Sequence, residues 1–88
     1  MKSENHFDYC NEILLNIQKF PKSAKEISAE TKIPITTVYK MIRLLESHEL
    51  IMASGILHRY GKRRLFQCNG DFKSAHIKLH RIFQIEFA

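Results

Sequence analysis

Two helical patterns lie on either side of a four-residue break, and this spacing limits how the whole chain can fold. The break is Thr31-Lys32-Ile33-Pro34. Before it, Ser23 and Glu26 have the S-x-x-E spacing of a capping box, which predicts a helix of about two turns over residues 24–31. A helix this short is not stable alone, so it must pack against its neighbours.

The second pattern begins directly after the break. Pro34 sets its own backbone angle for the start of a helix, and the hydroxyl of Thr36 or Thr37 is expected to cap the new N-terminus. Apolar residues then recur at helical spacing up to about residue 49, at Val38, Ile42 and Leu45. The other side of this helix keeps polar side chains, at Thr37, Lys40, Arg43 and Ser47.

A longer amphipathic helix is predicted before these two, from about residue 5 to residue 19. Its apolar stripe has the i, i+3, i+4, i+7 spacing, with Cys10, Ile13, Leu14 and Ile17. Phe20-Pro21 ends the helix, because the residue before a proline is displaced from the helical region.

The apolar period changes from 3.6 to 2 after Leu50. Residues 51–57 and 65–68 are rich in strand-forming side chains, and Tyr60-Gly61 between them is expected to form the hairpin turn. The sequence pattern therefore predicts a β-hairpin after the third helix.

The last stretch, residues 70–88, fits two patterns. As a helix, Phe72, Ala75, Leu79, Ile82 and Phe83 form a stripe; as strands, Ile77, Leu79, Phe83, Ile85 and Phe87 alternate with polar residues. The abundance of Ile and Phe favours strands, so a β extension is the interpretation preferred from sequence.

Basic charge is concentrated in the hairpin. The chain has 88 residues, 14 Lys and Arg against 9 Asp and Glu, and a formal net charge of +5. Residues 51–70 hold four basic residues and no acidic one: Arg59, Lys62, Arg63 and Arg64. Such a cluster is typical of a phosphate-binding surface, and a hairpin tip made basic for solubility is the alternative.

The composition and the motifs of the sequence exclude several classes of protein. Eighty-eight residues allow one ordinary domain, no stretch approaches the roughly 18–20 apolar residues of a membrane span, and no apolar signal-peptide run follows the N-terminus. We expect a cytoplasmic chain with two reduced, partly buried thiols, since Cys10 and Cys68 are far apart in sequence. Catalytic and cofactor motifs are absent from the sequence, so neither an enzyme nor a cofactor is expected.

The order of elements is that of a winged helix-turn-helix: an α+β fold of three helices and a β-hairpin wing. Residues 22–51 resemble the helix-turn-helix core of small ArsR-like winged-helix transcriptional regulators, especially single-domain archaeal ones. Residues 61–66, Gly-Lys-Arg-Arg-Leu-Phe, are similar to the tip and return strand of their wing. Lys32 stands where these proteins often have glycine, which implies a left-handed backbone at a cost of about 1 kcal/mol. The paired cysteines of metal-sensing members are missing, so no metal is expected.

The resemblance implies a sequence-specific, double-stranded DNA-binding transcriptional regulator, associated with the nucleoid. The helix of residues 36–49 would lie in the major groove, and wing residues 58–64 on the backbone or in the minor groove. The residues expected to contact DNA are Thr36, Thr37, Tyr39, Lys40, Arg43, Arg59, Lys62, Arg63 and Arg64. Thr36 and Thr37 could instead be helix caps only, and Tyr39 could pack against the second helix.

Partners and alternatives complete the predictions. Residues 1–70 are expected to form the DNA-binding domain, and residues 71–88 to pack on it or to form the interface of a homodimer together with the first helix. No small-molecule ligand and no membrane is indicated. The alternative function is a winged-helix protein–protein adaptor; a redox switch through Cys10 or Cys68 is a third class.

His76 and His80 are four residues apart and share one side of either a helix or a strand. Two histidines without a third ligand make a weak metal site, so a pair facing solvent or DNA is preferred.

Overall fold

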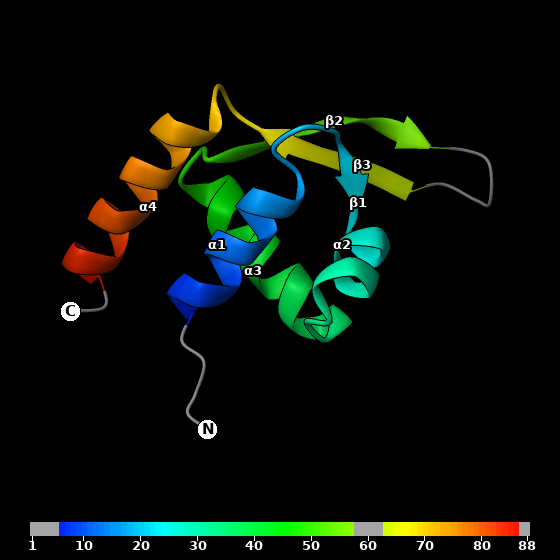
Figure 1. The fold of residues 1–88 in the computed structure, drawn as a ribbon, viewed down its shortest axis with the longest axis horizontal. Coiled ribbons are helices and arrows are strands. Elements are labelled where there is room, and N and C mark those ends of the chain that lie inside the picture. Colours follow the sequence, from blue (N-terminus) through cyan, green and yellow to red (C-terminus); the bar gives the residue numbers. More distant parts are fainter. Residues whose placement is uncertain (1–5, 58–62, 87–88) are drawn as a thin grey trace.

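The computed structural model of the protein describes residues 6–57 and 63–86. Within them the chain forms a mixed α+β architecture, as predicted (Figure 1). The elements in chain order are α1 (His6–Asn16), β1 (Lys22–Ser23), α2 (Ala24–Thr31), α3 (Ile35–Ser47), β2 (Ile51–Leu57), β3 (Arg63–Cys68) and α4 (Phe72–Glu86). The first helix is therefore shorter than its sequence pattern, because it ends at Asn16.

The strands form one antiparallel sheet in the order β1-β3-β2. β2 and β3 are the predicted hairpin, with Ile51 opposite Cys68 and a register shift between Ala53 and Gly55. β1 is not predicted by the sequence pattern; its two residues pair with β3, Lys22 opposite Phe66. In Figure 1 the hairpin extends away from the helices at one end of the molecule, and α4 lies beside α1 at the other. The predicted turn at Tyr60-Gly61 falls outside the described residues.

The helix-turn-helix formed by α2 and α3 confirms two local predictions and corrects a third. The backbone N–H of Glu26 donates to Ser23 Oγ (3.2 Å) and that of Ser23 donates to the Glu26 carboxylate (2.9 Å), completing the capping box. Lys32 has a φ of 68°, and its N–H donates to the Ser28 carbonyl at 2.9 Å. The threonine cap of α3 is wrong. Pro34 is the N-cap without a side-chain cap bond, and α3 begins at Ile35, so both threonines lie inside the first turn.

Residues 72–86 form a helix, so the predicted β extension is wrong. Ala75 and Leu79, four residues apart, are buried, and α4 packs against α1. Asp71 caps the helix, because its carboxylate accepts from the backbone N–H of Ser74 at 2.7 Å; this bond holds the pKa of Asp71 below its usual value. Gly70 turns the chain just before it, with a φ of 91°. Burial of one helical stripe against α1 outweighs the strand preference of single Ile and Phe residues.

The core is one cluster to which all four helices and the sheet contribute. Residues from α1, α3 and α4 are completely or almost completely buried, among them Ile13, Leu14, Met41, Leu45 and Leu79. Cys10 and Cys68 are free and buried, as predicted. The Cys10 thiol lies 3.7 Å from the sulfur of Met41, which places it in the centre of the packed helices. Within the described residues, no helix is long and apolar enough to span a membrane.

Candidate nucleic-acid interface

α3 divides its residues between the core and solvent. Val38, Met41, Ile42 and Leu45 are buried, so packing against the core stabilises the helix along this side. The predicted DNA-contacting side chains project from the other side: Thr36, Lys40 and Arg43 are exposed, Tyr39 is 51% exposed, and Thr37 is half-buried. The sequence thus places a polar and basic face on the second helix of a helix-turn-helix.

Arg64 is the predicted wing residue whose side chain the structure describes. It lies on β3, and its side chain is 60% exposed. Its Nη2 atom is 3.5 Å from Oε2 of Glu46 on α3, and its guanidinium lies over the Phe66 ring, 5.3 Å from the ring centroid. Arg63 also belongs to β3, with its backbone opposite Leu57. Arg59 and Lys62 lie outside the described residues.

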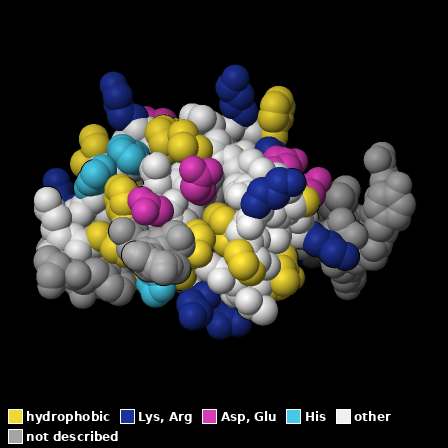
Figure 2. Space-filling view, turned by 60° about the horizontal axis from the view of Figure 1, so that its bottom comes forward, with side chains coloured by type: hydrophobic (Ala, Val, Ile, Leu, Met, Phe, Trp, Pro, Cys, Tyr) yellow, Lys and Arg dark blue, Asp and Glu magenta, His cyan; other side chains and the backbone are white. Residues whose placement is uncertain are grey.

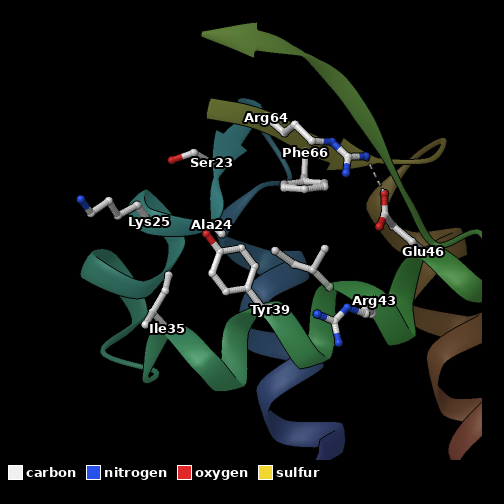
Figure 3. Close-up of a pocket in the computed structure, with 10 residues that line it drawn as sticks. Ser23, Ala24, Lys25, Ile35, Tyr39, Arg43, Glu46, Arg64 and Phe66 are labelled. Atoms are coloured by element: carbon white, nitrogen blue, oxygen red, sulfur yellow. Dashed lines mark ion pairs between the residues drawn. The ribbon is translucent and has the colours of Figure 1, made fainter. Parts of the chain in front are cut away.

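An open groove of about 580 Å³ separates α3 from β3 and the start of α2, and we call it the α3–β3 groove (Figure 3). Its apolar lining consists of Ala24, Ile35, Tyr39, Ile42 and Phe66, and its charged lining of Lys25, Arg43, Glu46 and Arg64. Tyr39 points from α3 toward the start of α2, and Lys25 extends away from the groove. The groove brings together three predicted residues, Tyr39, Arg43 and Arg64.

Several groove residues are not identified by the sequence pattern. The sequence pattern predicts only that Phe66 belongs to a strand and Lys25 to a helix. It assigns no partner to the charge of Glu46. Glu46 has one available signal, because it follows Arg43 by three residues and so lies on the same side of a helix. The contribution of β3 to the groove depends on how the sheet packs on α3, which no local spacing reveals.

The histidine pair lies on the opposite side of the molecule from the hairpin. His80 Nε2 is 3.3 Å from His76 Nε2, and the Phe7 ring of α1 lies 4.8 Å from the His80 ring. Figure 2 shows imidazoles, in cyan, gathered at the surface beside apolar side chains. The described residues contain no group of three His, Cys, Asp or Glu side chains placed to hold a metal ion.

Comparisons with known proteins bear on the fold. No protein-family model matches the chain, and no curated protein sequence matches it. Among solved structures, it is similar to a PadR-like transcription factor from Bacteroides fragilis, at 17% identity and a TM-score of 0.69, over 90% of this chain and 82% of that one. It is also similar to a single-substitution mutant of MepR from S. aureus (17% identity, TM-score 0.60, 93% of this chain and 59% of that one).

A third similar structure is Pex from Synechococcus sp., at 17% identity and a TM-score of 0.55, over 92% of this chain and 83% of that one. The chain is therefore a winged-helix domain, and the fold predicted from the order of its elements is confirmed. At 17% identity the likeness concerns the fold alone, so the ArsR-like resemblance stays a prediction.

Proposed function

We infer that this chain is a sequence-specific, double-stranded DNA-binding transcriptional regulator. The observation that carries this proposal is the exposed face of α3, where Thr36, Tyr39, Lys40 and Arg43 stand on the second helix of a helix-turn-helix. The α3–β3 groove joins this face to Arg64 on the strand that leads out of the hairpin. A PadR-like protein of similar fold is described as a transcription factor, which supports the same assignment.

The proposed contacts divide into base-reading and phosphate-binding groups. Residues of α3 would enter the major groove, where their donors and acceptors meet base edges and flanking phosphates: Thr36, Thr37, Tyr39, Lys40 and Arg43. The wing would contact the backbone or the adjacent minor groove, where narrow grooves attract arginine: Arg59, Lys62, Arg63 and Arg64. The helix supplies sequence preference, and the wing supplies affinity.

The proposed regulator acts as a homodimer through α1 and residues 71–88, with residues 1–70 carrying the DNA contacts. α1 exposes Asp8, Glu12 and Leu15, whereas α4 exposes Lys73, Ile77 and Arg81. Each set lies on one side of its helix, because its members are three or four residues apart. On the face shown in Figure 2, acidic side chains lie among apolar ones, and several basic side chains lie at the outline. An acidic stripe and a basic stripe, each with one apolar residue, are complementary between two copies.

Selection from random duplexes, followed by sequencing, tests the function. We expect a preferred site, with two half-sites about 34 Å apart if the dimer binds a palindrome. Affinity should fall with salt, with a log–log slope of about −0.9 per phosphate neutralised. Lys40→Ala should change the preferred sequence, whereas Arg64→Ala should weaken binding to all duplexes.

Lys19→Ala is the matched control, because Lys19 is an exposed cation between α1 and β1, outside the proposed interface. It should leave affinity and sequence preference unchanged. The absence of salt-dependent binding to any duplex would contradict the proposal. Stoichiometric capture of one protein partner in that case would favour the adaptor function instead.

A further inference from the structure

We propose that Glu46 competes with DNA for Arg64 within the same chain. Its carboxylate holds the Arg64 guanidinium in the free protein, and a DNA phosphate must take the guanidinium from it. Glu46 therefore lowers the affinity for every duplex by a similar factor and leaves the preferred sequence unchanged. This inference rests on the proposed function, in which Arg64 is a phosphate contact.

The Arg64–Glu46 ion pair joins the two parts of the proposed DNA interface. Glu46 belongs to α3 and Arg64 to β3, and both side chains line the α3–β3 groove. Nη2 of Arg64 is 3.5 Å from Oε2 of Glu46, and Figure 3 shows the pair linking the helix to the strand. A phosphate that approaches Arg64 must therefore also approach a carboxylate.

The Arg64 guanidinium has two contacts in the free protein. Its central carbon lies 5.3 Å from the centroid of the Phe66 ring, within the roughly 6 Å of a cation–π contact. Phe66 is 5% exposed, so the core fixes its ring. The ring contacts the face of the guanidinium, whereas Glu46 contacts one nitrogen at its edge. Phe66 can therefore keep the guanidinium in place while a phosphate replaces the carboxylate.

The exchange is possible because the ion pair is weak and accessible. Its length of 3.5 Å exceeds the about 2.8 Å of a charge-assisted hydrogen bond of full strength, and a phosphate can accept two parallel N–H bonds from one guanidinium. The Arg64 side chain is 60% exposed. An ion pair this exposed changes an equilibrium by a factor of at most about five, so Glu46 weakens DNA binding without preventing it.

Arg43 provides a contrast on the same helix. It is exposed, and in Figure 3 its side chain points away from the Arg64–Glu46 pair. Arg43 belongs to the proposed base-reading group, whereas Arg64 belongs to the proposed phosphate contacts, which carry no sequence information directly. Replacement of Glu46 should therefore change affinity and leave sequence preference as it is.

Salt dependence distinguishes this competition from a structural role of Glu46. With Glu46 present, the two paired side chains bring no net charge to the DNA. With glutamine at this position, Arg64 brings one positive charge, so the log–log slope of affinity against salt should become steeper by about 0.9. A purely structural effect would change the affinity and leave the slope unchanged.

The test measures the affinity of the full chain for a selected duplex and for duplexes of random sequence, over a range of salt concentrations. Glu46→Gln should strengthen binding to both about three- to fivefold. In an Arg64→Gln chain the same substitution should have little effect, because no guanidinium is left to release. Glu49→Gln is the matched control, since it removes one negative charge at an exposed position after α3, and it should change affinity by less than about twofold.

Retention on immobilised heparin is the second readout, because heparin is a polyanion without base edges. Glu46→Gln should elute at higher salt than the wild type, provided that Arg64 is present. Weaker duplex binding by Glu46→Gln would show that the carboxylate positions Arg64 for DNA, and so would overturn the competition. An equal gain with and without Arg64 would overturn it too, because Glu46 would then act by repelling DNA directly.

The two readouts separate this proposal from the proposed function. Duplex binding that is the same for Glu46→Gln and the wild type overturns the competition and leaves the DNA-binding function standing. Later elution of Glu46→Gln from heparin, without binding of either chain to any duplex, supports the competition for Arg64 and overturns the DNA-binding function.

Discussion

Positive φ angles outside glycine occur, among the described residues, at two places where a helix of the helix-turn-helix ends. Lys32 follows α2 with a φ of 68°, and Glu49 follows α3 with a φ of 62°. In both cases the residue makes a local backbone hydrogen bond at the turn: Lys32 N–H donates to the carbonyl of Ser28, and Glu49 N–H donates to the carbonyl of Glu46. The left-handed backbone is therefore maintained by helix capping, at the energetic cost of a Cβ in that region.

Replacement of Lys32 by glycine should stabilise the fold. Lys32→Gly removes the Cβ that is strained at positive φ, so the free energy of unfolding should rise by about 0.5–1 kcal/mol in urea denaturation. Ala29→Gly is the control, since the same residue placed inside α2 should lower stability by about 1 kcal/mol. A loss of stability in Lys32→Gly would show that its side chain contributes more than its backbone costs.

The buried thiols should be unreactive in the folded protein. Burial raises the pKa of Cys10 from its usual 9.0 to about 12, and it raises the pKa of Cys68 as well. At pH 8 both thiols therefore stay protonated, whereas the thiolate is the species that reacts with a disulfide reagent. We expect slow modification of the native protein, at the rate at which it opens, and fast modification in denaturant.

The same pKa shift has a defined effect on stability. The unfolded chain releases its thiol protons near pH 9, whereas folded Cys10 holds its proton up to about pH 12. Stability from this residue is therefore complete below pH 9 and is lost as the pH rises toward 12. Rapid labelling of either thiol in the native protein at pH 8 would contradict this account and favour a redox role.

The four helices differ in how well the sequence predicts them. The capping box of Ser23 and Glu26 and the apolar stripe of α3 are local signals, so they predict α2 and α3 close to their true ends. The sequence pattern of α4 misleads because apolar residues at 79 and 83 are separated by four, a spacing that fits both a helix and alternate positions of a strand. Asp71, directly before the helix, is the N-cap signal that favours the helix. β1 is not predicted because a strand of two residues is too short to show an alternating pattern.

Replacement of Leu79 tests whether α4 is part of the domain's core. Leu79 is 1% exposed in the same cluster as Ile13 of α1, so Leu79→Ala should lower the free energy of unfolding by about 2–5 kcal/mol. Lys78→Ala, on the exposed side of α4, should change it by less than about 0.5 kcal/mol. Urea denaturation followed by circular dichroism measures both. Equal effects of the two substitutions would show that α4 is an appendage of the domain.

At the scale of the molecule, the charges are arranged in separate regions. Arg64 of β3 lies on the hairpin at one end, while α1 presents acidic side chains and α4 basic ones at the other. The site could be predicted in part, because the face of α3 follows from helical periodicity. The α3–β3 groove could not, because it forms only where β3, a strand from later in the chain, packs beside the same helix. The net charge of +5 therefore describes neither the basic face of α3 nor the oppositely charged stripes of α1 and α4.

Complementary stripes on α1 and α4 predict that a charge reversal will weaken the proposed dimer and that a second reversal will restore it. In a two-fold dimer each contact occurs twice, so Glu12→Lys replaces two attractions by two repulsions. At about 0.5–1 kcal/mol for each pair, the dimer dissociation constant should rise about tenfold or more, measured by sedimentation at low salt. Adding Lys73→Glu and Arg81→Glu to the Glu12→Lys chain should bring it back toward the wild-type value.

Glu49→Lys is the matched control, because it makes the same change in net charge at an exposed position after α3. It should leave the dissociation constant unchanged, and raising the salt concentration should reduce the difference between Glu12→Lys and the wild type, since exposed charges are screened. A monomer at every concentration would contradict the proposed dimer itself. A dimer insensitive to all these reversals would place the interface elsewhere, because surfaces other than the α1 and α4 stripes would then carry the association.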